Sequence, residues 1–307
     1  MELLEKLVSI QGTSGDESAI STFVVDYVKK EQINWKTKPE ILYGGNFQDA
    51  IILVFGKPTT AVFAHLDTIG FTTGYDGHLI KIGGPRVIDE MELVGQDSEG
   101  EIETELMLVE DEDGNRLMKY VFSREIERGT PLSFKPNFRL NKEFVQSPYM
   151  DNRLGVWTAL RLAETIENGI IVFSTYEEHG GNSVGFLGNY IYKNYGVRKA
   201  LIADITWVTS GVVHGGGVAI SLRDSGIPRR KYIQKIVALA KESGVKFQLE
   251  VESAGGSDGT MLQKSDLPFD WCFIGAPEDN VHSPDEKVAL SDINDMLEMY
   301  RYLMKHL

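Results

Sequence analysis

The first part of the chain shows two helical patterns separated by a break. Apolar side chains recur on one helical face over residues 3–8, and the pattern stops at 11–15, where glycine and polar residues gather. A second helical pattern follows and ends at about Lys30. Ser14 and Glu17 have the three-residue spacing of a capping box, so we expect them at the start of the second helix.

The segments after these helices alternate between apolar strands and amphipathic helices. Residues 50–55 and 61–64 are continuous apolar runs bounded by glycine, proline or threonine, which is typical of strands buried on both faces of an α/β sheet. The alternation returns after about residue 150. It predicts helices over 153–167, 184–194, 229–242 and 291–306, and strands over 170–175, 200–204, 245–251 and 271–274.

Between about residues 75 and 147 the period changes from helical to alternating. Polar and apolar side chains alternate over 101–106, an Asp-Gly-Asn turn follows at 113–115, and alternate residues over 118–122 share an apolar face. This pattern indicates a β-hairpin. We therefore predict a three-layer α/β/α sandwich with a mixed sheet, formed by residues 1–74 and 148–307, and a small β-rich domain inserted at 75–147.

The chain is acidic, with 31 Lys and Arg against 45 Asp and Glu and a formal net charge of −14. Such a surface repels phosphate backbones and anionic lipid, so we expect neither nucleic acid nor a membrane as a partner. The apolar runs are shorter than the roughly 20 residues of a spanning helix, and the amino terminus does not read as a secretory signal. Cys272 is the single cysteine, which forbids an intrachain disulfide and favours a cytoplasmic protein.

Histidines and carboxylates gather where the predicted strands end. The carboxyl ends of parallel strands open on one crevice in α/β sheets, so such groups can converge from distant parts of the chain. Two further residues, Asp151 and His282, lie in loops that can reach the same place. The groups at the strand ends are His65, Asp67, Glu177, Glu178 and Asp204.

Each of these signals also has an ordinary structural explanation. A chain with 45 acidic residues contains adjacent acidic pairs by chance, so Glu177-Glu178 means little alone. His65 alone is more simply a satisfied polar residue than a metal ligand. Asp151 alone could cap the helix that follows it. The complete order of the motifs along the chain is much harder to obtain by accident.

Seven short motifs follow one another along nearly the whole chain: GTSGDE at 12–17, AHLDTIGF at 64–71, MDNRLG at 150–155, YEEHG at 176–180, ADIT at 203–206, GSDG at 256–259 and VHSP at 281–284. Their order resembles that of the TET-type dinuclear metallo-aminopeptidases, a family that also includes glutamyl aminopeptidases and cellulase-M-like proteins. The family carries a β-rich insertion between the histidine motif and the MDNRLG motif, where the period changes here.

Carried over residue by residue, the resemblance implies a centre for two divalent metal ions. One ion would be held by His65 and Asp204, the other by Glu178 and His282, with Asp151 bridging both. Zinc is the favoured ion, with cobalt or manganese as alternatives, because histidine nitrogen and carboxylate oxygen suit all three.

Two further carboxylates receive roles without binding metal. Asp67, two residues after His65, is expected to orient the imidazole. Glu177 is expected to act as general base and then general acid, taking a proton from a metal-bridging water and passing it to the leaving amine. Two ions of this kind acidify water and polarise the scissile carbonyl. The implied function is removal of amino-terminal residues from peptides.

The chain departs from the family at several loop positions. His179 stands where an apolar residue is common, and we interpret it as a tolerated variant rather than a substrate contact. His214 precedes three glycines that either admit a substrate or form a surface turn. Asp258 lies near the site in the family, although turn chemistry also explains it. Glu278 and Asp279 occupy the stretch of a common Arg-Tyr pair, and we hypothesise that they hold the substrate's α-amine or a basic side chain.

Three alternatives stay open at the level of function. Related desuccinylases, deacylases and carboxypeptidases use a similar two-metal site but carry their insertion later in the chain. A cellulase would need a carboxylate pair flanking a sugar rather than five metal ligands. A non-catalytic protein of the same fold would more simply lack Glu177 or a ligand. Relatives use the insertion to build dimers and dodecamers, so the resemblance implies a homo-oligomer and an oligomerisation or lid role for residues 75–147.

Overall fold

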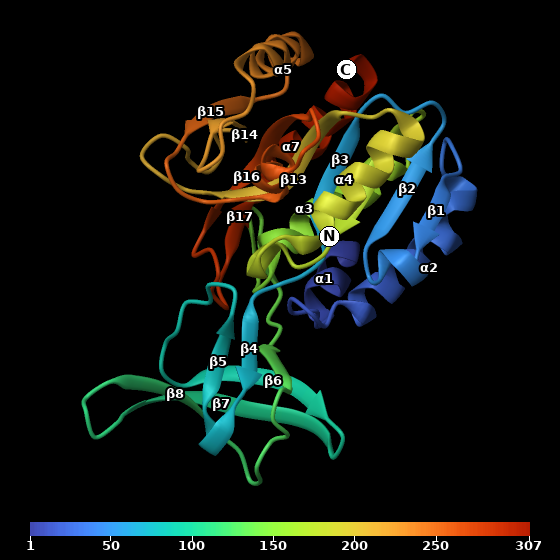
Figure 1. Ribbon diagram of the computed structural model, residues 1–307. Helices are drawn as coiled ribbons and strands as arrows, with labels where there is room; N and C mark the ends of the chain where they lie inside the picture. The colour runs from blue at the N-terminus through green and yellow to red at the C-terminus, as the bar shows by residue number, and fades with distance from the viewer.

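The computed structural model describes residues 1–307, except for the side chain of Asn182, and contains two separate sheets (Figure 1). Within the described residues, no helix has the length and apolar character that crossing a membrane requires. The helices are α1 (Glu2–Ser9), α2 (Ser18–Glu31), α3 (Met150–Ala163), α4 (Asn182–Tyr195), α5 (Arg230–Ser243), α6 (Asp258–Lys264) and α7 (Leu290–His306).

The larger sheet has eleven strands in the order β1-β2-β12-β3-β13-β16-β17-β11-β10, with β14 pairing with β16 and β15 pairing with β14. Parallel and antiparallel pairs both occur, so the sheet is mixed, as predicted. Its strands are β1 (Glu40–Tyr43), β2 (Ile51–Phe55), β3 (Ala61–His65), β10 (Arg139–Leu140), β11 (Phe144–Gln146), β12 (Gly169–Ser174), β13 (Lys199–Trp207), β14 (Val218–Arg223), β15 (Phe247–Val251), β16 (Asp270–Asp279) and β17 (Lys287–Ala289).

The centre of this sheet is parallel. Strand β3 lies between β12 and β13 and runs parallel to both, and β13 runs parallel to β16. In this register His65 stands opposite Ser174, at the carboxyl ends of β3 and β12. Because neighbouring parallel strands end at the same edge, the residues that follow them face a common crevice.

Helices cover both faces of the larger sheet (Figure 1). Buried apolar side chains of α1, α2, α3, α5 and α7 share one hydrophobic core with one face, and those of α4 and α6 pack against the other. Strands β2, β3 and β12 are buried along their whole length, which explains their uninterrupted apolar sequences. The predicted three-layer arrangement is confirmed.

The smaller sheet is antiparallel throughout and has the order β5-β4-β9-β6-β7-β8. The predicted hairpin is formed by β7 and β8 around the Asp-Gly-Asn turn. Figure 1 shows this sheet extending away from the larger one. Its strands are β4 (Gly70–Thr73), β5 (Leu79–Ile82), β6 (Met91–Asp97), β7 (Gly100–Glu110), β8 (Arg116–Val121) and β9 (Pro131–Phe134).

The predicted capping box at the start of α2 is wrong. The helix begins at Ser18, and neither the Ser14 nor the Glu17 side chain caps it. Ser14 instead donates to Asp67, and Glu17 accepts a hydrogen bond from the backbone N–H of Tyr176.

The division of the chain into two domains at residues 75 and 147 stays a prediction. The strands of the smaller sheet span 70–134, and β10 and β11, inside the predicted insertion, pair with the larger sheet.

Candidate active site

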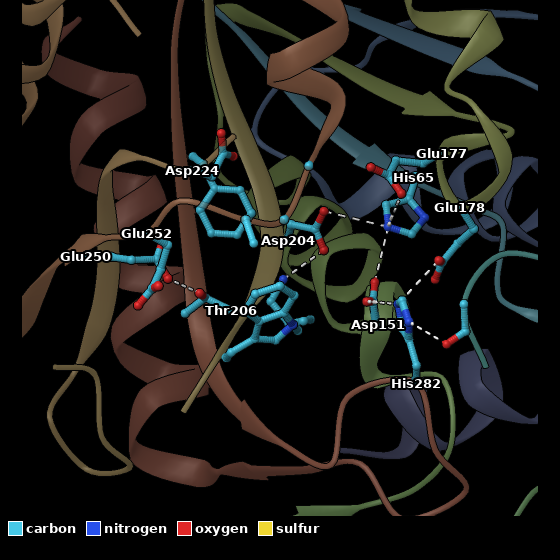
Figure 2. Close-up of a pocket in the computed structure, with 17 residues that line it drawn as sticks. His65, Asp151, Glu177, Glu178, Asp204, Thr206, Asp224, Glu250, Glu252 and His282 are labelled. Carbon is cyan, nitrogen blue, oxygen red and sulfur yellow. Dashed lines mark hydrogen bonds and ion pairs between the residues drawn. The ribbon is translucent and has the colours of Figure 1, made fainter. Parts of the chain in front are cut away.

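The structure brings together the sequence-predicted metal ligands at the carboxyl edge of the parallel strands (Figure 2). His65 ends β3, and Asp204 lies in the neighbouring strand β13, two residues beyond the point where β3 and β13 pair. Glu178 follows β12 in a short 3-10 helix. Asp151 is in the first turn of α3, and His282 lies between β16 and β17.

The first group of donor atoms consists of His65, Asp151 and Asp204, all buried. Nε2 of His65 lies 3.2 Å from Oδ1 of Asp151 and 3.6 Å from Oδ2 of Asp204. One donor atom from each residue lies within 4.8 Å of the others. A nitrogen and two carboxylate oxygens facing one point form a set that zinc and similar divalent cations accept.

The second group consists of Asp151, Glu178 and His282, and it shares Asp151 with the first. Nε2 of His282 lies 3.3 Å from Oδ2 of Asp151 and 3.3 Å from Oε2 of Glu178. The two oxygens of Asp151 therefore face different histidines, one in each group. This arrangement suits a carboxylate that bridges two cations.

Asp67 contacts residues of both donor groups without belonging to either. Its side chain is completely buried, and its two oxygens accept hydrogen bonds of 3.0 and 3.1 Å from the backbone N–H groups of Glu177 and Glu178. Nδ1 of His65 lies 3.1 Å from the backbone carbonyl of Asp67 and 3.5 Å from its carboxylate. Asp67 thus fixes the turn after β12 as well as the imidazole, and the sequence predicted only the second of these roles.

Glu286 supports the second group, and sequence reasoning did not find it. One of its oxygens accepts a 3.2 Å hydrogen bond from the backbone N–H of Asp151, and the other accepts a 2.9 Å bond from the N–H of His282. His282 has a φ of +65°, a left-handed conformation that is strained for a non-glycine residue, so this bond helps to hold it. The available signal was a carboxylate four residues after a histidine, which has no specificity in an acidic chain.

A loop of the smaller sheet closes one side of the second group. Nδ1 of His282 lies 3.2 Å from the carbonyl of Gly84, and the N–H of Arg86 donates a 2.8 Å bond to the carbonyl of His282. A Cβ on Gly84 would lie 3.2 Å from Nδ1 of His282. A Cβ on Gly83, whose φ is +67°, would lie 3.2 Å from Oε2 of Glu178. Glycines permit this close approach of the loop to both side chains.

The charges of the two groups do not balance without a cation. Burial raises the pKa of Glu178 well above the ordinary carboxyl value, and the nearby charge of Asp151 adds to this. Burial also raises the pKa of Asp204 to about 6, although His65 opposes the shift. Oε1 of Glu178 is buried and accepts no hydrogen bond within the described part of the chain. These residues therefore fit divalent cations, which would supply the missing positive charge and bind the free oxygen.

Glu177 lies beside the two groups without belonging to either. Oε2 of Glu177 is 4.0 Å from Nε2 of His65, and its side chain is 16% exposed toward a pocket that the donor groups also line. Burial raises the pKa of Glu177 well above its usual value, although His65 opposes the shift. A carboxyl group with a raised pKa is suited to taking up a proton and passing it on.

The pocket continues past the donor groups to residues that sequence reasoning missed. Beyond Asp204 it is lined by Thr206 and by the carboxylates of Asp224, Glu250 and Glu252, which Figure 2 shows on the side away from His282. The weak signal was the placement of Asp224 directly after an apolar strand, the same feature that identified His65 and Asp204.

The other residues singled out in the sequence lie in different surroundings. The carboxylate of Asp279 pairs with Nε2 of His214 at 3.1 Å and with Lys287 at 2.8 Å. Glu278 is 1% exposed, and neither of its oxygens has a hydrogen-bond partner within the described residues. Nδ1 of His179 accepts a 3.2 Å bond from the N–H of Gly83. None of these four side chains is among the pocket-lining residues found in the described structure.

Asp258 is buried beside Ser174, the last residue of β12. It is 1% exposed, accepts a 2.5 Å hydrogen bond from the hydroxyl of Ser174, and begins α6. Burial raises its pKa to about 7, while His65 opposes the shift. The side chain of Asp258 therefore lies in the interior rather than on the surface.

Comparison with known proteins agrees with this geometry. The family model described as M42 glutamyl aminopeptidase matches residues 114–299. A protein of Acetivibrio thermocellus, named as a candidate aminopeptidase, is 26% identical over 97% of this chain and 96% of its own. A TET aminopeptidase from a marine sediment thaumarchaeon has a similar fold, with a TM-score of 0.86 and 16% identity over 100% of this chain and 96% of that one.

The TET1 peptidase of Pyrococcus horikoshii is also similar in fold, with a TM-score of 0.82 and 22% identity over 100% of this chain and 99% of that one. It is described as assembling into a tetrahedron or a large octahedral shell. The resemblance drawn from the seven motifs is thereby confirmed. The chain belongs to the M42 glutamyl aminopeptidase family.

Proposed function

We propose that this protein is a metal-dependent aminopeptidase that hydrolyses the first peptide bond of peptides with a free amino terminus. The observation that carries the proposal is the pair of donor groups joined by Asp151, with the unligated carboxylate of Glu177 beside them. Family membership supports the same class of reaction. A polar pocket leads from these groups, so the site has room for a substrate.

The residues that would hold the metal ions are those expected from the motifs. His65 and Asp204 would hold one ion and Glu178 and His282 the other, with Asp151 shared by both groups. Zinc is the favoured ion, and cobalt or manganese would also accept this set. When bound, a pair of such ions supplies Lewis acidity toward the scissile carbonyl and lowers the pKa of water in the site.

Glu177 would move the proton that peptide hydrolysis requires. Its Oε2 lies 4.0 Å from Nε2 of His65, and the residue lines the pocket shared with the donor groups. We assign it the uptake of a proton from the attacking water and the delivery of that proton to the nitrogen of the leaving amine. Asp67 holds the backbone of Glu177 in place, so the proton-transferring oxygen keeps its position relative to His65.

The test is hydrolysis of matched peptides with free and acetylated amino termini by metal-stripped protein, with zinc, cobalt or manganese added back separately. We expect cleavage to return with metal and to be confined to free amino termini. Metal-dependent cleavage of acylated substrates alone would instead assign the protein to the related amidohydrolases. Failure of every metal to restore cleavage, despite two bound ions, would indicate a non-catalytic protein of the same fold.

We also propose that the chain forms homo-oligomers in the cytoplasm. The shells described for the Pyrococcus horikoshii relative support assembly, and the acidic surface supports the absence of nucleic-acid and membrane partners. Residues 75–147 are proposed as a domain that serves in oligomerisation or as a lid. Light scattering on the full chain and on a variant altered on the exposed face of the smaller sheet would test this role.

A further inference from the structure

The far end of the pocket is a second chemical environment, distinct from the metal-binding end. It is lined by the carboxylates of Asp224, Glu250 and Glu252, which we call the acidic end of the pocket. In Figure 2 these carboxylates lie on one side of Asp204 and Thr206, and Glu178 and His282 lie on the other side. A substrate whose first peptide bond lies at the donor groups would therefore extend its first side chain along this wall.

The fold places these residues through the edge of the larger sheet. Strand β13 runs past Asp204 to Thr206, whose hydroxyl donates a hydrogen bond to Glu250 of β15. Asp224 directly follows β14, the strand between β15 and β16, and its Oδ1 accepts a 2.5 Å bond from the N–H of Gly226. The acidic end is thus built by strands whose positions the sheet fixes.

The three carboxylates lack a cationic partner. No Lys, Arg or His nitrogen in the described part of the chain lies within 4.0 Å of their oxygens. The nearest arginine in sequence, Arg223, directs its Nε to the backbone carbonyls of Asp224 and Glu252 instead. Asp224 and Glu250 are only 7% and 3% exposed, so their carboxylates are largely removed from water without a cation beside them. Such a carboxylate is costly, and a ligand cation would relieve that cost.

Strand β15 reverses the usual alternation of a surface strand. Leu249 and Val251 are 45% and 63% exposed, whereas Glu250 between them is 3% exposed. A strand with one solvated face ordinarily turns its apolar residues inward. Inside the protein Glu250 accepts a hydrogen bond from Thr206 but has no cationic partner, so its inward position leaves a negative charge facing the pocket. Burial raises the pKa of Glu250 and of Asp224, in agreement with the absence of a cation beside them.

From these contacts we propose that the acidic end of the pocket binds the positively charged side chain of an amino-terminal lysine or arginine, so that the protein prefers basic residues. This inference rests on the proposed aminopeptidase function and adds the substrate class. The aliphatic stem of such a side chain would lie against Phe273 and Trp207, which also line the pocket. An acidic side chain in the same place would be repelled by three carboxylates.

The α-amine of the substrate is a different cation and must be separated from this role. It adjoins the scissile bond, so it lies near the donor groups rather than across Thr206. Loss of a carboxylate that bound the α-amine would slow every substrate equally. Loss of one that binds the side chain would slow only substrates with a basic first residue. The two roles are therefore distinguishable by comparing substrates.

The experiment measures kcat and KM of the metal-loaded protein on lysyl, norleucyl and glutamyl derivatives of one fluorogenic amine. Norleucine has the same four side-chain carbons as lysine but lacks the terminal ammonium group. We expect kcat/KM for the lysyl substrate to exceed that for the norleucyl substrate at least about tenfold, chiefly through KM, since paired charges in a desolvated site contribute strongly to recognition. The glutamyl substrate should be the slowest of the three.

Conservative variants locate the preference. Glu250→Gln and Asp224→Asn are expected to lower kcat/KM for the lysyl substrate about tenfold and to leave the norleucyl value within about twofold. Glu252→Gln, at a half-buried position, gives a milder version of the same change and remains informative should a deeper variant fail to fold. Glu242→Gln, on the exposed surface of α5, removes the same charge far from the pocket and is the matched control.

Two results would overturn the inference while leaving the proposed function intact: equal rates on lysyl and norleucyl substrates, or equal losses on both in the pocket variants. Absence of turnover on all three substrates would count against the proposed function instead. Calorimetric titration of the metal-loaded protein with lysine amide and with norleucine amide then decides the inference, because tighter binding of lysine amide supports it and equal affinities refute it.

Discussion

One oxygen of the buried Asp67 carboxylate accepts a 3.0 Å hydrogen bond from the backbone N–H of Glu177. The acidic residue after β3 thereby fixes the position of the residue assigned to proton transfer, which lies 110 positions later in the chain. A second bond, from the N–H of Glu178, fixes the neighbouring residue, a proposed metal ligand, in the same way. The Asp67 carboxylate thus holds two consecutive residues of the turn after β12.

Asp67→Asn is expected to destabilise the fold and to slow turnover. An asparagine amide can accept only one of the two N–H groups and presents a donor to the other, which leaves a buried N–H unpaired. The expected loss in the free energy of unfolding is about 1 to 3 kcal/mol. Urea denaturation and kcat should both report the change.

Ser14→Ala is the matched control for that variant. The Ser14 hydroxyl donates a 2.6 Å bond to the same carboxylate but does not touch the turn after β12. We expect a loss of about 1 kcal/mol in stability with little effect on kcat. Asp67→Asn with the stability and turnover of the wild type would contradict the role assigned to Asp67.

Glu177→Gln is expected to retain both metal ions and to lose most turnover. The substitution removes the proton-accepting oxygen without removing a ligand atom, and general acid–base catalysis contributes about 10²- to 10⁴-fold. Metal content by mass spectrometry should equal that of the wild type. Glu178→Gln is the comparison variant, since it should lose metal as well as activity. Full activity in metal-loaded Glu177→Gln would refute the proton-transfer assignment.

Asp151→Ala is expected to lose both metal ions together, because its two oxygens face the two donor groups separately. Removal of a ligand that served one group alone would instead leave the other ion bound. Metal analysis after dialysis against a defined free-metal concentration gives the number of ions retained. Two ions per chain in this variant would exclude the bridging role.

Metal removal is expected to lower the thermal unfolding temperature. An ion that binds the folded chain stabilises it by about 2.7 kcal/mol for each site when its free concentration is 100 times the dissociation constant. Calorimetric scans with chelator and with added zinc should therefore differ by several degrees. Asp151→Ala supplies the control, and a response of this variant as large as that of the wild type would place the stabilising ions elsewhere.

Glu17 is expected to make stability depend on pH. Burial raises its pKa from 4.5 to about 7, opposed by the N–H of Gly15 and reinforced by Asp67. The folded state therefore holds this proton more tightly than the unfolded state does. As pH rises from about 4.5 to 7, ionisation favours the unfolded chain, and stability falls; above pH 7 this contribution is constant.

The measurement compares the wild type with Glu17→Gln by urea denaturation of metal-free protein at several pH values between 4.5 and 8. The variant lacks the titrating group but keeps an oxygen for the N–H of Tyr176. Its advantage in free energy of unfolding over the wild type should grow with pH across that range. A constant difference would show that Glu17 does not titrate as proposed.

The sheet and its ligand positions were predictable because they follow from local pattern and one rule of geometry. Continuous apolar runs predicted β3 and β12. Because parallel strands end at a common edge, His65 could be expected near Glu178 from the sequence alone. The assignment of each ligand to one ion came from the family resemblance, since composition and spacing allow several pairings.

Other features depend on tertiary contacts that no local pattern contains. Ser14 and Glu17 have the spacing of a capping box, but Asp67 and the N–H of Tyr176 offer them stronger partners in the folded chain. Glu250 alternates with Leu249 and Val251, so the sequence favours an outward-facing charge, yet the strand presents it to the pocket. Such reversals arise where a binding site, rather than the core, determines which face of a strand lies inward.

Gly83 and Gly84 carry the backbone of the smaller sheet's loop against Glu178 and His282. One wall of the catalytic centre is therefore made by a segment that belongs to the other sheet. The smaller sheet is for this reason not an exchangeable module, because a graft or deletion that moved this loop would remove the contacts of Gly84 and Arg86 with His282, a proposed metal ligand. A change in how that sheet is held by a neighbouring subunit would reach the reaction centre by the same route.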